Sequence, residues 1–181
     1  MSAQPAAAVA ATTILRIGLG TVLVAHGSQK LFGLFGGGGI EGTAQAMHGM
    51  GFRPGRRNAV LAGIGEAGSG AALVLGVGTP LAGAGAATTM GVASSSHVPN
   101  GFFNAGGGLE FPAFLGLAAA TFALGGPGPV SLDHASGHVL DRPWMRGLAL
   151  VAIPVAIGVQ VYRRRQVLAA ERSESAETSG S

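Results

Sequence analysis

Long apolar stretches separated by short polar ones run through most of this chain and predict helices that cross a membrane. Five stretches qualify, at residues 12–35, 58–77, 80–97, 110–125 and 144–162. A helical span needs about 20 predominantly apolar residues, so the third and fourth stretches are at the short end of the range. We therefore predict an all-α membrane protein with five transmembrane helices.

Several residues mark the ends of these helices. Pro80 stands at the first helical position of the third span, and Pro112 falls in the first turn of the fourth, where its missing N–H costs little. Pro154 lies inside the fifth span and predicts a kink there. Trp144 and Tyr162 bracket the same span, as aromatic residues do at membrane interfaces.

The composition agrees with a membrane protein. Only 10% of the residues are charged, whereas 48% are hydrophobic and 33 of 181 are glycine. A soluble domain carries about 25% charged residues, and small residues let helix backbones approach closely in a bilayer. The chain has no cysteine. This excludes disulfides, thiolate metal sites and a cysteine nucleophile, so redox chemistry would need a borrowed cofactor or another subunit.

The basic residues predict the orientation in the membrane. One group of four lies at or in the connection between the first two spans: Lys30, Arg53, Arg56 and Arg57. A second group of four follows the last span: Arg163, Arg164, Arg165 and Arg172. Basic residues concentrate on the cytoplasmic side, and four spans separate the two groups. Five spans therefore place the N-terminus outside and the C-terminus in the cytoplasm. The alternative is four spans, with one weak segment re-entrant or interfacial.

The ends of the chain and its partners follow from the same pattern. Residues 1–11 form a short N-terminal segment without the basic region of a signal peptide, so we expect the first apolar stretch to be retained. Residues 136–162 are predicted as an outer loop and the fifth span. Residues 163–181 are predicted as a polar cytoplasmic tail, disordered after its first turn. The lipid bilayer is the expected partner, and no basic stripe interleaved with aromatic residues points to nucleic acid.

Polar and ionisable residues inside the predicted spans are the strongest functional signal. A charged group in the bilayer is costly, so it normally faces the bundle interior and has a partner. Six residues fall at a similar depth on four helices, and we call them the polar layer: His26, Gln29, Lys30, Glu66, His97 and Glu110. Arg16 stands apart, nearer the outer face. We expect it to reach outward to the interface or to pair with an acid in an outer loop.

The polar layer has two interpretations from the residues alone. In the first, Glu66 forms a buried ion pair with Lys30 or His26 that fixes helix packing, and His97 and Glu110 cap helices. In the second, the layer is a site for a quinone head group, a proton path or a small polar ligand. The ligand spacing does not favour a metal. In the outer loop, His134 and His138 favour capping and solvated roles over metal binding.

A set of motifs also runs in order through residues 12–135. They are Arg16, HGSQKLFG at 26–33, GGGGIEGTAQAMHGMG at 36–51, GIGEAGSGAALVLG around Glu66, His97 before GFF, GGGLE at 106–110 and GPGPVSLD at 126–133. With these motifs the chain resembles the DoxX family of small bacterial membrane proteins. The resemblance implies a bundle of about four helices, to which the fifth span is an addition.

The resemblance also implies a class of function. DoxX-like relatives include subunits of quinone-linked oxidoreductases acting on reduced sulfur compounds, and membrane partners in complexes that handle oxidative stress. We therefore expect a bacterial plasma-membrane subunit that binds quinone or docks a soluble oxidoreductase or other membrane subunits, including further copies of itself. The resemblance carries the polar layer over as family positions, without catalytic roles, and whether the chain is an enzyme stays open. The alternatives are a small transporter using the polar layer and a structural scaffold without chemistry.

Overall fold

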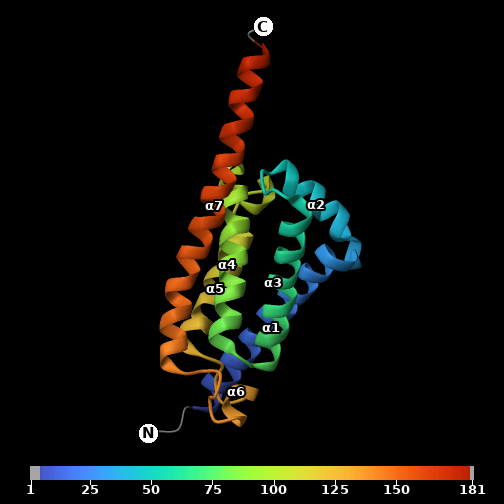
Figure 1. The fold of residues 1–181 in the computed structure, drawn as a ribbon. Coiled ribbons are helices and arrows are strands. Elements are labelled where there is room, and N and C mark those ends of the chain that lie inside the picture. The colour runs from blue at the N-terminus through green and yellow to red at the C-terminus, as the bar shows by residue number, and fades with distance from the viewer. Residues whose placement is uncertain (1–4, 180–181) are drawn as a thin grey trace.

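The computed structural model describes residues 5–179, which fold into helices with no strand among them. The five longest helices run alongside one another (Figure 1): α1 (Ala6–Phe32), α3 (Gly55–Leu75), α4 (Thr79–His97), α5 (Glu110–Gly125) and α7 (Pro143–Ser179). Short helices lie in the connections: η1 (Leu34–Gly36), α2 (Gly39–Gly49), η2 (Val98–Asn100), η3 (Asn104–Gly106) and α6 (Leu132–Ala135). The predicted fold class, an all-α membrane bundle with a fifth C-terminal helix, is confirmed.

Helices α2 and α6 lie at opposite ends of the bundle (Figure 1), and we use them to name these ends. The chain enters α1 near the α6 end, and α7 leaves the bundle at the α2 end. By length and composition α1, α3 and α7 can each cross a membrane, and α5 is apolar but shorter, with 16 residues. The chain is therefore a multi-pass membrane protein.

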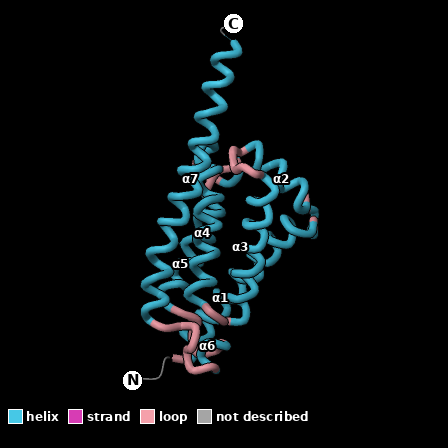
Figure 2. Tube along the Cα trace, in the orientation of Figure 1, coloured by secondary structure: helices cyan, strands magenta, loops and turns pink. Residues whose placement is uncertain are grey.

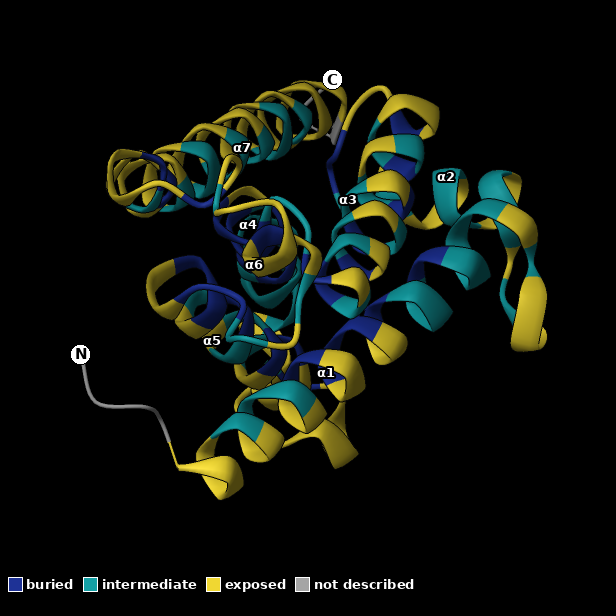
Figure 3. Ribbon diagram, turned by 90° about the horizontal axis from the view of Figure 1, so that it is seen from below, coloured by how far each residue is buried: buried dark blue, intermediate teal, exposed yellow. Residues whose placement is uncertain are grey.

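Helix α4 lies in the interior of the bundle. Viewed along the bundle it lies between α3, α5 and α7 (Figure 3), and it packs against all three. A helix enclosed by protein needs small packing residues more than lipid-facing ones, and Ala86 and Ala87 of α4 are buried. The outer faces of the bundle instead expose large apolar side chains such as Phe114 and Leu117. That distribution suits a lipid solvent.

Helices α1 and α3 cross at glycines. A Cβ atom added to Gly20 would lie 2.6 Å from the carbonyl oxygen of Gly70, and one added to Gly70 would lie 2.6 Å from that of Gly20. Such reciprocal contacts leave no room for any side chain. These glycines thus set the distance between α1 and α3, the two helices that position the candidate site.

Replacing Gly20 by alanine is expected to lower the free energy of unfolding by about 1–3 kcal/mol, since the new methyl group overpacks the crossing. Gly18 on the same helix has nothing within 4 Å of an added Cβ. Its replacement by alanine is expected to be neutral or to stabilise by a few tenths of a kcal/mol. Thermal unfolding of both variants in mild detergent checks this, and equal losses in the two would contradict the crossing.

The C-terminal segment differs from the prediction. Disorder was expected after the first turn of the tail, but α7 continues as a helix to Ser179, well beyond the bundle (Figure 2). The sequence there, AAERSESAE, is rich in good helix formers. An ion pair between Arg53 and Glu171 also ties the extension to the segment after α2. Within the bundle, α7 passes through Pro154 without ending.

Candidate functional site

A buried ion pair joins α1 to α3. The Nζ atom of Lys30 lies 2.8 Å from Oε1 and 2.6 Å from Oε2 of Glu66. The Glu66 side chain is 2% exposed and that of Lys30 is 26% exposed. Of the two partners that the sequence offered to Glu66, the structure thus selects Lys30. Two charges held this closely on neighbouring helices satisfy each other in a medium that would otherwise penalise both.

The ion pair faces a cavity of about 350 Å³ at the α2 end of the bundle. Lys30, Glu66 and His97 are its ionisable lining residues. Its walls come from α1, α3, α4 and α7 and from the end of α2 with the segment that follows it. They are mainly apolar: Met47, Met50, Phe52, Leu61, Ala62, Val92 and Ala93. We call this space the ion-pair cavity. It is an apolar pocket with charged groups at defined points.

Neutral polar groups also line the ion-pair cavity. Helix α4 supplies Thr88, Thr89 and Ser96, α3 supplies Asn58, and α7 supplies Gln160. Thr89 Oγ1 donates to the carbonyl oxygen of Gly85 at 2.9 Å, and Ser96 Oγ donates to that of Ala93 at 2.7 Å. Because these hydroxyl protons are used within α4, the oxygens remain as acceptors. The cavity thus combines one ammonium donor and two amides with hydroxyl oxygens that can accept.

The rest of the polar layer has other roles. The His26 ring packs against Phe111 of α5, with ring centroids 5.4 Å apart. Gln29 Nε2 donates to the carbonyl oxygen of Phe35 at 3.2 Å and so holds the turn after α1. Glu110 is exposed and accepts a hydrogen bond from the Asn104 backbone N–H at 3.0 Å. None of the three lines the ion-pair cavity, so the structure brings together only half of the predicted layer.

His97 contributes to the cavity from the end of α4. Its Nδ1 lies 2.7 Å from the carbonyl oxygen of Gly107, in the connection to α5. This contact requires a proton on Nδ1, because a carbonyl can only accept. The ring is therefore oriented by its own connection, and when the ring is neutral Nε2 is left as an acceptor.

Sequence reasoning missed the wall that α7, the end of α2 and the segment after α2 provide. Gln160 is a lone amide in an apolar stretch, and that was the available signal. Nothing in the sequence marked Met47, Met50 and Phe52 as cavity residues, because an apolar residue in a connection does not indicate which helix it packs against. The fifth helix, which brings no ionisable residue to this layer, nevertheless closes one side of the cavity.

Comparison with known proteins identifies the family. The DoxX family model matches residues 11–98. This part of the chain is a DoxX domain. The DoxX match extends from α1 to the end of α4 and contains all three ionisable residues of the ion-pair cavity, whereas α5 and α7 lie outside it. No curated protein and no solved structure matches this DoxX chain.

At the α6 end of the DoxX bundle, Arg16 is placed differently from the prediction. It does not reach outward, since the residue is 2% exposed. Its guanidinium donates to the carbonyl oxygens of Leu73 at 2.5 Å, Val74 at 3.1 Å and Val130 at 2.6 Å. The Asp133 carboxylate acts on it electrostatically, but the direct bonds go to backbone. Arg16 thus satisfies the last carbonyls of α3 and fastens the loop that follows α5.

Asp133 completes this junction of the DoxX protein from the other side. Its buried carboxylate accepts hydrogen bonds from the backbone N–H groups of Gly78 and Thr79 at 2.8 and 2.9 Å, and from Thr79 Oγ1 at 2.8 Å. It therefore caps the start of α4 from a distant loop. Sequence reasoning assigned Asp133 no such role, because the loop and the helix start are 54 residues apart.

The two histidines between α5 and α7 form a chain that ends on a buried carboxylate. His134 Nδ1 lies 3.2 Å from His138 Nε2, and His138 Nδ1 lies 3.1 Å from Asp141 Oδ2. Arg146 donates to both oxygens of Asp141 at 2.7 Å. Among residues 5–179 no group of three or more His, Asp or Glu side chains is placed to hold a metal. Burial alone would raise the pKa of Asp141, but the hydrogen bonds from Arg146 and His138 outweigh it and lower the pKa.

This shift predicts how stability depends on pH. Because the folded-state pKa of Asp141 lies below its usual 3.8, its contribution is present above that value and is lost as pH falls through the folded pKa. We therefore expect wild type to melt higher than Asp141→Asn at neutral pH, and the difference to shrink as the pH is lowered below 3.8. Melting curves across this range check it, with the exposed Glu174→Gln as control. A difference that stays constant with pH would contradict it.

Proposed function

We propose that the ion-pair cavity binds the head group of a membrane quinone, and that the chain is the quinone-interacting membrane subunit of a redox complex. The observation that carries the proposal is the cavity itself, which is mainly apolar and has charged groups at one wall. Its volume of about 350 Å³ falls in the range of small-molecule sites. An apolar ring with two hydrogen-bonding oxygens matches such a lining.

The donor set fits a quinone oxygen. Lys30 uses two of its three ammonium protons on Glu66, so the third is free to donate to a ring carbonyl. Met47, Met50 and Leu61 offer adaptable apolar walls for the ring. A bound quinone supplies two-electron chemistry coupled to the uptake of two protons. Lys30 and Glu66 hold a proton at the cavity wall, where the reduced ring would need one.

The electrons have to come from a partner. Because the sequence contains no cysteine, it cannot bind an iron–sulfur cluster through thiolates. A soluble or membrane-bound oxidoreductase docking at the α2 end would be next to the cavity. We include in the proposal that this end faces the bacterial cytoplasm, because basic residues concentrate on it. The N-terminus then lies outside and the C-terminus inside.

Lys30 offers a direct test, because it is the only lysine in the chain. Protein purified in mild detergent is treated with a small amine-reactive reagent, with and without added ubiquinone or menaquinone, and labelling of Lys30 is measured by peptide mass spectrometry. We expect quinone to protect Lys30 and to raise the melting temperature. Full labelling in the presence of either quinone, with no change in melting temperature, would refute the proposal.

A matched pair of alanines tests the location. Ala62 lines the cavity, and Ala71 lies exposed on the same helix α3. Ala62→Leu is expected to weaken quinone binding about tenfold, since a crowded pocket costs about 1–3 kcal/mol, whereas Ala71→Leu leaves binding unchanged. Equal quinone affinity in the two variants would place the quinone elsewhere.

A further inference from the structure

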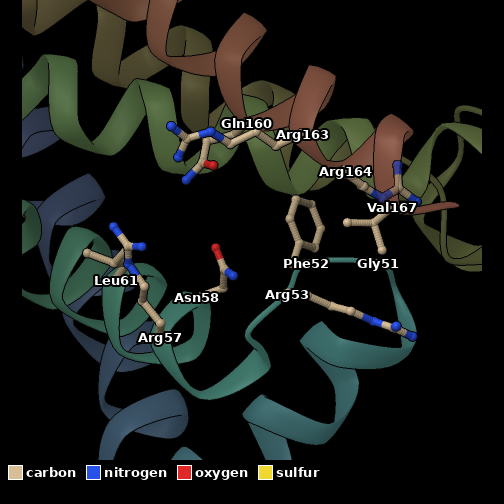
Figure 4. A pocket seen from close by; sticks show the side chains of 10 residues that line it. All are labelled: Gly51, Phe52, Arg53, Arg57, Asn58, Leu61, Gln160, Arg163, Arg164 and Val167. Carbon is tan, nitrogen blue, oxygen red and sulfur yellow. The ribbon is translucent and has the colours of Figure 1, made fainter. Parts of the chain in front are cut away.

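A second, smaller cavity lies beside the first and has a different chemistry. It occupies about 60 Å³ between the start of α3 and the part of α7 that leaves the bundle. Four arginines line it, and no carboxylate does: Arg53, Arg57, Arg163 and Arg164, with the amides of Asn58 and Gln160. Figure 4 shows Arg57 and Asn58 on the α3 wall and Gln160 and Arg163 on the facing α7 wall. We call it the arginine cavity.

Two of the four arginines are engaged by the protein. Arg53 pairs with Glu171. Arg164 donates to the carbonyl oxygens of Met50 at 2.7 Å and Ser95 at 3.3 Å, and its guanidinium lies 5.4 Å from the centroid of the Phe52 ring. These contacts hold α7 against the segment after α2 and against α4. Both residues therefore have a structural role.

The other two arginines have no such explanation. Within residues 5–179, neither the Arg57 side chain nor the Arg163 side chain has a hydrogen-bond or ion-pair partner. Both are exposed, so they do not support the packing of the bundle. Two unneutralised guanidinium groups at one cavity repel each other and form a preorganised site for an anion. Asn58 Nδ2 donates one N–H to the carbonyl oxygen of Pro54 at 2.9 Å, so its second N–H and the Gln160 amide are the further donors.

We propose that the arginine cavity binds the phosphodiester group of an anionic membrane lipid. The depth of the arginine cavity in the membrane favours a lipid as the ligand. Exposed Tyr162 directly precedes Arg163, and a tyrosine at the end of an apolar helix marks the level of the lipid head groups. Leu61, one turn along α3 from Arg57, is 50% exposed and provides an apolar path for the acyl chains. Basic pockets between helices recognise anionic head groups in this way.

The arginine cavity shares Phe52, Asn58, Leu61 and Gln160 with the ion-pair cavity, but its four arginines line the arginine cavity alone, so they are tested in the absence of quinone. Phosphatidylglycerol is titrated into protein held in a neutral detergent, where no anionic surface attracts every arginine alike. Lipid retention is followed by native mass spectrometry and binding by the rise in melting temperature. We expect wild type to retain phosphatidylglycerol in preference to phosphatidylcholine. Arg57→Gln and Arg163→Gln should each weaken binding about fivefold, the value of one arginine near a head group.

Arg165→Gln is the matched control, because this exposed residue removes the same charge from α7 and does not line the cavity. It should bind phosphatidylglycerol as wild type does. The same loss in Arg165→Gln as in Arg163→Gln would overturn the proposal, as would equal retention of the two lipids. Inorganic phosphate is the last arm. If phosphate alone reproduces the full rise in melting temperature and Arg57→Gln abolishes it, the site takes a free anion and the lipid assignment is overturned.

Discussion

Replacing Lys30 by methionine is expected to lower the free energy of unfolding by about 3–5 kcal/mol, the usual cost of removing one partner from a buried ion pair. The reason is the position of the remaining partner. The Glu66 side chain is 2% exposed, and both of its oxygens bond to Lys30. Without the ammonium group a carboxylate would remain between helices with nothing to satisfy it. Unfolding in mixed micelles, or the melting temperature in one detergent, measures the loss.

The reverse replacement provides the control. Glu66→Leu leaves Lys30 unpaired, but that side chain is 26% exposed towards the cavity and can take up water, so the loss should be smaller. The double variant Lys30→Met with Glu66→Leu removes both charges and should recover most of the stability, because an apolar pair can replace a buried ion pair. A double variant as unstable as Lys30→Met alone would contradict this account.

The same variants separate a structural ion pair from a site. If Lys30 and Glu66 only fix the packing of α1 on α3, the double variant should keep its stability and should still rise in melting temperature when quinone is added. If they serve the ion-pair cavity, the double variant should fold but no longer rise in melting temperature when quinone is added. Stability and ligand binding therefore respond differently, which makes the two interpretations of the polar layer distinguishable.

How far the sequence predicted the site depends on the kind of evidence each residue offered. Lys30 and Glu66 were predictable because a charge inside a span needs a partner at the same depth, and depth can be counted along helices. His26 has the same depth and the same helix face, but it packs on Phe111 instead. Rotation of one helix against the next decides between such neighbours, and hydropathy does not encode that rotation.

The fold was predictable to a similar degree. Apolar length and prolines located α3, α4 and α5 to within a few residues, whereas α1 began earlier than predicted, at Ala6, and α7 continued beyond the predicted span to Ser179. The end of α1 came earlier, at Phe32, because Gly33 adopts a left-handed conformation with φ of 72° and stops the helix. Contacts between distant segments, such as Arg53 with Glu171, could not be predicted from the sequence, since they depend on how the helices assemble.

Arg16 is the clearest case of a residue whose role required the structure, and its replacement should have the second large effect. Arg16→Met is expected to lower the free energy of unfolding by about 3 kcal/mol, since hydrogen bonds from a charged donor contribute about 1.5–3 kcal/mol each. Three carbonyl oxygens lose their donor. Removing a buried charge offsets part of that loss. Thermal unfolding measures the change, with exposed Arg142→Gln as a control expected to stay within about 0.5 kcal/mol of wild type.

Arg16→Lys tests whether geometry or charge is responsible. A guanidinium reaches Leu73 with one terminal nitrogen and Val130 with the other, whereas a single ammonium cannot occupy both positions. We expect the lysine variant to lose about half as much stability as the methionine variant. Hydrogen exchange should also rise at the Asp133 amide, which bonds to the carbonyl oxygen of Gly76 at 2.8 Å in the same junction. Only the forked guanidinium can fasten the end of α3 and the distant loop at once, so both changes are expected. A lysine variant with wild-type stability and exchange would instead show that charge alone matters.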